Sequence, residues 1–157
     1  MADFSKTSMK TFYLDTEFNS FGGELISLAL VSHDCETRFY EVLPYEHMKI
    51  HPWVEANVIP VLFKKPCGTK LDAQRKLGKF LTENAVNNEI KIVADWPEDF
   101  KFLCDFMLTA PGTCLSIPNI IMVIDRVNLP STADYSLTPH NAMEDALALA
   151  RFTKIKH

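Results

Sequence analysis

Near the N-terminus stands Thr11-Phe12-Tyr13-Leu14-Asp15-Thr16-Glu17, an apolar and aromatic run that leads directly into two carboxylates. Residues 11–14 have the composition of a β-strand. Because alternate residues of a strand point to the same face, Asp15 and Glu17 can converge on one point. Carboxylate oxygens are hard ligands that suit Mg²⁺ or Mn²⁺. The segment therefore predicts a strand followed directly by a candidate metal site.

The same spacing occurs a second time, at Asp34 and Glu36, so a D-x-E pair is not specific by itself. The second pair lies in a polar turn at 33–36, between expected strands at 25–32 and 37–43. Two solvated charges in a turn need no function, and a polar surface pair is the plain alternative for any isolated D-x-E. The first pair differs because it follows an apolar strand that we expect to be central.

Beyond these strands, the chain alternates between helical and strand patterns. Residues 44–69 hold four of the nine prolines and predict loop with short helical pieces. We then expect, in order, a helix at 71–85, a strand at 89–95, a helix at 99–108, a strand at 120–124 and a helix at 139–153. Pro139 suits the first turn of the last helix. The order β-β-β-α-β-α-β-α predicts an α/β fold with one mixed five-stranded sheet flanked by helices.

Length and composition limit the classes of protein to which the chain can belong. The 157 residues fit one domain, which we assign to residues 1–157. Hydrophobic residues make up 47% and charged residues 23%, as in ordinary globular proteins. The four cysteines have no C-x-x-C spacing, so we do not expect a zinc site built on cysteine pairs. The net charge of −4 argues against a general nucleic-acid coat protein but not against an enzyme whose site is a cluster of carboxylates.

Three features favour a cytoplasmic protein. No apolar run reaches the roughly 18 residues that are needed to span a bilayer. Residues 1–5 show no basic patch followed by an apolar stretch, so we expect no signal peptide. Free thiols in a reducing compartment are consistent with the same location.

A second group of candidate residues stands near the C-terminus, in the segment His140-Asn141-Ala142-Met143-Glu144-Asp145-Ala146. His140 lies close to the expected helix start, and Asp145 lies more than one turn further in. A histidine on a loop edge beside an aspartate on a rigid helix is what a general base and a metal ligand require. The alternative is helix-start chemistry, because the helix dipole favours acidic residues near the N-terminus.

Between these two motifs, a strand ends and a helix begins in the segment Ala94-Asp95-Trp96-Pro97-Glu98-Asp99. Helix capping is the simple explanation for at least two of its three carboxylates. Asp99 differs from the others because Phe102 and Leu103 follow it at a D-x-x-F-L spacing.

Taken together, the three motifs resemble those of the DEDDh exonuclease family. Asp15 and Glu17 match its first motif. Asp99 matches the second, and His140 with Asp145 matches the third. The resemblance covers nearly the whole chain, and it implies an RNase H-like fold and 3′→5′ exonuclease activity.

A closer resemblance is to the small bacterial and phage exoribonucleases of the RNase AS and RNase T type. It rests on the aromatic Phe18 after the first motif and on His-Pro-Trp-Val-Glu-Ala-Asn-Val-Ile-Pro at 51–60. This likeness implies single-stranded RNA as the substrate, and a homodimer. The chain departs from the family at Pro97-Glu98, where a small or aromatic residue often precedes the second-motif aspartate. Asp95 is therefore a rival to Asp99 for that role.

The resemblance also implies a two-metal hydrolysis with two Mg²⁺ ions, for which Mn²⁺ is an alternative. Asp15 would bridge both ions, and Glu17 and Asp145 would complete the site that activates the water. Asp99 would hold the second ion, and His140 would take the proton from the attacking water. Because four carboxylates in one place repel one another, we expect some to be partly protonated without metal.

The expected substrate-binding residues are Phe18, Asn19, Trp53 and Trp96. Phe18 is the best candidate to stack on a terminal base, a contact worth roughly 1–3 kcal/mol. For each aromatic residue, packing in the core is the alternative.

Two other functions stay open at this point. A preference for deoxyribose would make the chain a single-stranded DNA nuclease or a proofreading nuclease. A catalytically silent nucleic-acid-binding module is less favoured, because we would expect such a relative to have lost metal ligands. The sequence shows no group that must contact a 2′-hydroxyl, so RNA is preferred over DNA only through the resemblance.

Overall fold

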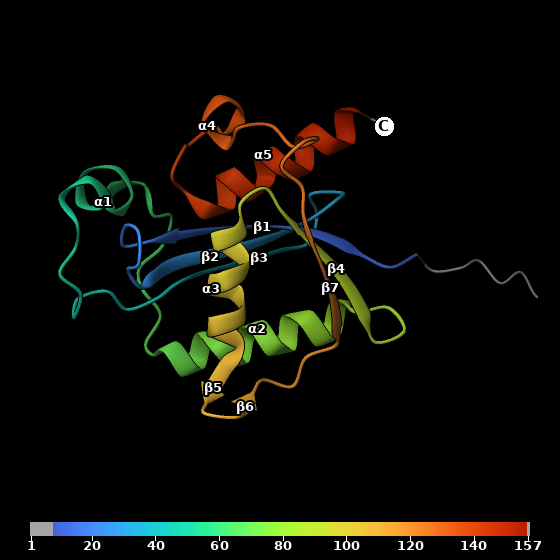
Figure 1. The fold of residues 1–157 in the computed structure, drawn as a ribbon, viewed down its shortest axis with the longest axis horizontal. Coiled ribbons are helices and arrows are strands. Elements are labelled where there is room, and N and C mark those ends of the chain that lie inside the picture. Colours follow the sequence, from blue (N-terminus) through green and yellow to red (C-terminus); the bar gives the residue numbers. More distant parts are fainter. Residues whose placement is uncertain (1–7, 157) are drawn as a thin grey trace, which may run out of the picture.

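A five-stranded mixed sheet forms the centre of the fold (Figure 1). The computed structural model describes residues 8–156. The strands of this sheet are β1 Thr11–Phe18, β2 Leu25–Ser32, β3 Arg38–Val42, β4 Glu89–Ala94 and β7 Asn119–Ile124. Their order is β3-β2-β1-β4-β7, with antiparallel pairing from β3 to β1 and parallel pairing from β1 to β7. The predicted α/β class with one mixed five-stranded sheet is confirmed.

β1 is longer than the sequence predicts. The strand expected at residues 11–14 continues through both carboxylates, because Asp15 and Glu17 still pair with β2. A register shift between Glu17 and Phe18 interrupts the regular pairing. The two carboxylates therefore lie within the central strand of the sheet rather than after it.

Three long helices cover the two faces of the sheet. They are α2 Lys70–Asn84, α3 Pro97–Met107 and α5 Ala142–Ile155. One apolar core contains side chains from α2 and α3, and a second, on the opposite face, contains side chains from α5. Figure 1 shows α5 along one side of the sheet and α2 along the other. The helix predicted at 71–85 is thus shifted by one residue, and the one predicted at 99–108 begins two residues earlier.

Alternation along β1 connects the central strand to both cores. Phe12 and Leu14 are buried in the core with α2 and α3, whereas Tyr13 is buried in the core with α5. Since alternate residues share a face, Asp15 continues the α5 side and Thr16 continues the α3 side. A single strand can therefore present polar groups to two different helices.

Several short elements complete the fold. The region 44–69 contains the helix α1 Pro52–Asn57 and the 3₁₀ turn η1 Ile59–Val61, in agreement with the loop and short helical pieces expected there. The prediction missed a hairpin of β5 Leu108–Ala110 and β6 Thr113–Cys114, and the short helix α4 Thr132–Tyr135. Pro111 and Gly112, the latter with a φ of +69°, form the turn of that hairpin and were its sequence signal.

The last helix begins at Ala142, so the predicted start at Pro139 is wrong. Asn141 is the N-cap, and its side-chain oxygen accepts a hydrogen bond from the Glu144 N–H at 3.1 Å. The side-chain amide of the same residue donates to the Val61 carbonyl at 2.7 Å. Asp145 consequently lies in the first turn of α5.

Among the described residues, no helix is long and apolar enough to cross a membrane. All four cysteines lie in this part of the chain, and each is a free thiol. The expectation that there is no signal peptide concerns residues 1–5, which lie outside the described residues.

We predict that Asn141→Ala lowers the free energy of unfolding by about 2 kcal/mol, because it removes a helix cap and leaves the Val61 carbonyl without its donor. Urea denaturation provides the measurement. Asn57→Ala is the matched control, since Asn57 donates only to the Trp53 carbonyl at the surface. Equal effects of the two substitutions would show that Asn141 does not connect α5 to η1 in this way.

Candidate metal centre

A first set of carboxylates forms between β1 and α5. Asp15, Glu17 and Asp145 each offer an oxygen, and these oxygens all lie within 4.8 Å of one another. Asp15 and Glu17 share one face of β1, and the first turn of α5 places Asp145 beside them. Three carboxylate oxygens at this separation can coordinate one divalent cation.

A second set forms where β4 ends and α3 begins. Asp15, Asp95 and Asp99 also offer oxygens that lie within 4.8 Å of one another. Asp15 belongs to both sets, which is the arrangement that a residue bridging two ions requires. Asp95 and Asp99 were rivals for one role in the sequence, and the structure brings both of them to Asp15.

Thr16, which the sequence analysis did not single out, anchors the second set. Its backbone N–H and its Oγ1 hydroxyl both donate to Asp99 Oδ1, at 3.1 and 2.6 Å. The residue reaches Asp99 because it faces α3, whereas Asp15 and Glu17 on either side of it do not. Because alternate residues of a strand face opposite sides, the position of Thr16 between Asp15 and Glu17 already indicated that it faces the other side of the sheet.

Helix capping does not account for the carboxylates of the middle motif. The N-cap of α3 is Trp96, and no side chain makes the capping hydrogen bond there. At α5 the cap is Asn141, while Asp145 Oδ2 accepts a hydrogen bond from the His140 N–H at 3.2 Å. Asp145 still lies in the first turn of α5, where the helix dipole favours an acidic residue.

The carboxylates are buried without a protein cation. Asp15, Asp99 and Asp145 are 8%, 3% and 4% exposed, and Asp15 Oδ2 and Asp145 Oδ1 have no hydrogen-bond partner among residues 8–156. Within the same described range, no basic side chain forms an ion pair with any member of either set. The buried Glu41, by contrast, is paired with two lysines. Buried charges need a partner, so these donor sets fit divalent cations.

Burial and mutual repulsion shift the proton affinities of the same groups. Burial, followed by the charges of neighbouring carboxylates, raises the pKa of Asp15 and Glu17 well above the ordinary values. Burial also raises the pKa of Asp99 to about 7, against the opposing effect of the Thr16 hydrogen bonds. The pKa values of Asp95 and Asp145 are raised by burial as well. Part of the set therefore carries protons near neutral pH when no cation is bound.

His140 lies beside the first set, on the wall of a small cavity. Its backbone has a φ of +68°, which is uncommon for a residue other than glycine. Its ring packs against that of Trp53 in a T-shaped arrangement, with ring centroids 4.9 Å apart. The cavity, of about 200 Å³, is lined by Glu17, Phe18, Ser20, His51, Trp53, Val54 and His140.

The structure separates the four expected substrate-binding residues. Phe18 and Trp53 line the small cavity, although Phe18 also stacks on Phe102 at 4.5 Å. Asn19 lies outside the cavity lining, and its side chain bonds the backbone of Lys49 and His51.

Trp96 also lies outside the small cavity. Its indole N–H donates to Glu98 at 3.0 Å, and the Arg126 guanidinium covers its ring at 4.4 Å. The prediction that Asn19 and Trp96 contact substrate therefore gains no support from the lining of the small cavity. The sequence patterns could not distinguish a residue beside a motif from one that faces the site.

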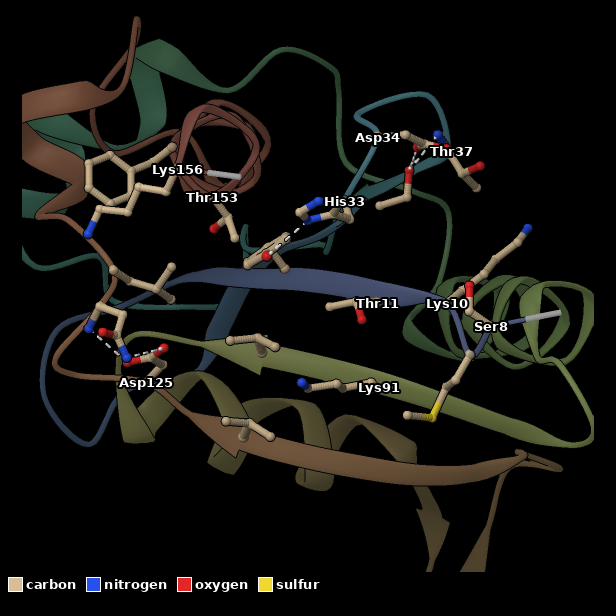
Figure 2. Close-up of a pocket in the computed structure, with 18 residues that line it drawn as sticks. Ser8, Lys10, Thr11, His33, Asp34, Thr37, Lys91, Asp125, Thr153 and Lys156 are labelled. Carbon is tan, nitrogen blue, oxygen red and sulfur yellow. Dashed lines mark hydrogen bonds between the residues drawn. The ribbon is translucent and has the colours of Figure 1, made fainter. Parts of the chain in front are cut away.

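A larger cavity, of about 850 Å³ (Figure 2), has no member of either carboxylate set in its lining. It is bounded by the start of β1 and the end of α5, including Thr11 and Thr153, whereas the first carboxylate set lies further along β1 and at the start of α5. Lys10, Lys91 and Lys156 are on its wall. This cavity is therefore separate from the candidate metal centre, although it is larger than the cavity beside His140.

No protein-family model matches the chain, and comparison with curated proteins gives no match either.

We predict that the metal-free protein loses stability as the pH rises from about 4 to 7. A carboxyl group with a raised pKa binds its proton more tightly in the folded state. Its contribution is present below the unfolded pKa of about 4 and is lost as the pH passes the folded value, about 7 for Asp99. Urea midpoints measured in EDTA between pH 4 and 8 test this.

Asp15→Asn should flatten that pH dependence and stabilise the metal-free protein relative to the wild type at pH 8, because it removes a carboxyl group whose ionisation is opposed by burial and by neighbouring carboxylates. Asp125→Asn is the control of opposite sign, since hydrogen bonds from Asn128 lower the pKa of Asp125. Adding Mg²⁺ at pH 8 should stabilise the wild type and not Asp15→Asn. Stability in EDTA that does not vary with pH would contradict the electrostatic account.

Proposed function

We propose that this chain is a metal-dependent 3′→5′ exonuclease of the DEDDh type that hydrolyses single-stranded RNA. The strongest support is the meeting of two carboxylate sets at Asp15, directly beside His140. All five residues that match the family's motifs contribute to this region. The comparisons with family models and curated proteins gave no match, so the proposal depends on the sequence motifs and on the arrangement of the carboxylates and His140.

The topology of the sheet is compatible with the RNase H-like fold that the resemblance implies. Three antiparallel strands lead into two parallel ones, and β1 is central. The carboxylates come from the central strand, from the end of its parallel neighbour β4 and from helices on both faces. This architecture brings ligands together from four separate parts of the chain.

Each carboxylate has a defined role in the proposed hydrolysis. Asp15 is shared by both sets, Glu17 and Asp145 complete the first, and Asp99 belongs to the second. Divalent cations bound there would supply positive charge to the attacking and leaving oxygens of an in-line displacement. The Thr16 hydrogen bonds hold Asp99 in place, which keeps the second set assembled.

His140 is the proposed general base, which takes a proton from the attacking water. It lies one residue before the N-cap of α5, and its backbone N–H is bonded to Asp145. Packing against Trp53 restricts the ring on the side of the small cavity. The main chain of the proposed base, His140, is therefore hydrogen-bonded to Asp145, a candidate metal ligand.

The small cavity is the proposed site for the terminal nucleotide. Its volume of about 200 Å³ lies below the roughly 300–1,000 Å³ of sites for drug-sized ligands, which favours one base over several. Trp53 offers an aromatic surface for stacking, and Phe18 offers a second. Because stacking tolerates every base, this contact supports stepwise removal without strict sequence preference.

The first experiment uses 5′-labelled single-stranded RNA and DNA of the same sequence, with Mg²⁺ or with EDTA. We expect a ladder that shortens from the 3′ end of RNA, and no products in EDTA or with Asp15→Asn. His140→Ala should lower the rate roughly 10²–10⁴-fold, because the general base is lost. His47→Ala is the matched control, since His47 is exposed and pairs only with Glu24.

The same experiment distinguishes the exoribonuclease from a DNA nuclease and from a nucleic-acid-binding module without activity. Faster shortening of DNA than of RNA would assign the chain to the DNA nucleases. Binding of single strands without cleavage under Mg²⁺ or Mn²⁺ would reject the enzyme and leave a binding module.

A further inference from the structure

We propose that Asp95 is a direct ligand of the second divalent cation, so that three carboxylates hold this ion: Asp15, Asp95 and Asp99. The inference rests on the proposed metal centre and deepens it. The family pattern places a single aspartate in this motif, whereas the chain offers two. The second cation would then be bound directly by three carboxylates, of which Asp15 is shared with the first set.

Strand register places Asp95 beside Asp15. β1 and β4 are parallel neighbours, and Tyr13 pairs with Val93. Asp15 lies two residues further along β1, and Asp95 directly follows the end of β4. Side chains two residues apart share a face, and neighbouring strands are separated by about 4.8 Å. The common face is the one packed by α5, because Tyr13 and Val93 both belong to that core.

The anchoring of Asp99 leaves room for a third ligand. Its Oδ1 already accepts two hydrogen bonds from Thr16, so its other oxygen is the one left for a cation. Asp15 contributes a buried carboxylate whose Oδ2 has no partner among the described residues. A site made from these two residues alone would offer few charged oxygens. Asp95 adds a third carboxylate within 4.8 Å of both.

Within residues 8–156, no side-chain ion pair occupies the Asp95 carboxylate, and the nearby charge of Arg126 only partly opposes the rise that burial causes in its pKa. Arg126 is the basic residue nearest to it in the contacts of the described chain, but its Nη1 donates to the Asp95 main-chain carbonyl at 3.1 Å. The guanidinium of Arg126 lies over the ring of Trp96, and Trp96 in turn bonds Glu98. These contacts fix the backbone at the start of α3.

The test is Mn²⁺ binding to the metal-free chain, which is measured through the electron paramagnetic resonance signal of free Mn²⁺. The wild type should bind two Mn²⁺ ions. Asp95→Asn should weaken one of them by roughly tenfold or more and leave the other unchanged, because one charged oxygen is lost from the second set only. A spin-coupled two-Mn²⁺ signal should be present in the wild type and reduced in this variant.

Two variants sharpen the comparison. Glu98→Gln is the matched control, because Glu98 lies in the same segment but bonds Trp96 and belongs to neither carboxylate set. It should bind Mn²⁺ as the wild type does. Asp95→Glu keeps a carboxylate and should recover part of the lost affinity. Circular dichroism establishes that each variant is folded before it is compared.

If Asp95→Asn binds two Mn²⁺ ions with the affinity of the wild type, the assignment of Asp95 as a metal ligand is wrong. Failure of the wild type to bind Mn²⁺ would overturn the metal centre and this inference with it. If the wild type binds two ions, Asp95→Asn loses one, and neither nucleic acid is cleaved, the assignment of Asp95 stands and the exonuclease proposal fails. Binding and cleavage thus report on the two proposals separately.

Discussion

Burial of several mutually repelling carboxylates around Asp15 is the constraint on which the rest of the structure depends. A buried charge without a partner costs several kcal/mol, and the described residues supply no cation for Asp15, Asp99 or Asp145. The cost is offset by apolar packing on both faces of the sheet, where α2 and α3 bury one face and α5 the other. Packing in the two cores thus maintains an electrostatically unfavourable cluster of carboxylates that could hold a metal ion.

Hydrogen bonds from the backbone and from neutral side chains then set the position of each charge. Thr16 orients Asp99 from the α3 side of β1, and the His140 N–H orients Asp145 from the other side. Asn141 caps α5 and also binds the Val61 carbonyl, which connects the start of that helix to η1. The proposed base and the cavity wall that carries Trp53 therefore belong to one connected region. A change in that connection should affect metal ligands and the cavity together.

Local pattern was sufficient for most of the regular elements. Alternating and apolar runs predicted all five strands of the sheet, and the helical period predicted α2 to within one residue. Helix starts were less predictable, because α5 depends on an Asn141 cap whose second partner is 80 residues away. The hairpin after α3 was missed although Pro111 and Gly112 mark it. Asn19 and Trp96 stay predictions as substrate-binding residues, and the polar contacts of their side chains are with Lys49, His51 and Glu98.

The residue types in three short motifs were enough to indicate a carboxylate site, because strand alternation and helix position are local properties of the chain. Which carboxylates meet was decided only by the tertiary structure. The parallel register of β1 and β4 brings Asp95 to Asp15, and packing on the two faces adds Asp99 and Asp145. Those contacts join residues about 80 to 130 positions apart, and no local pattern determines how such strands and helices align.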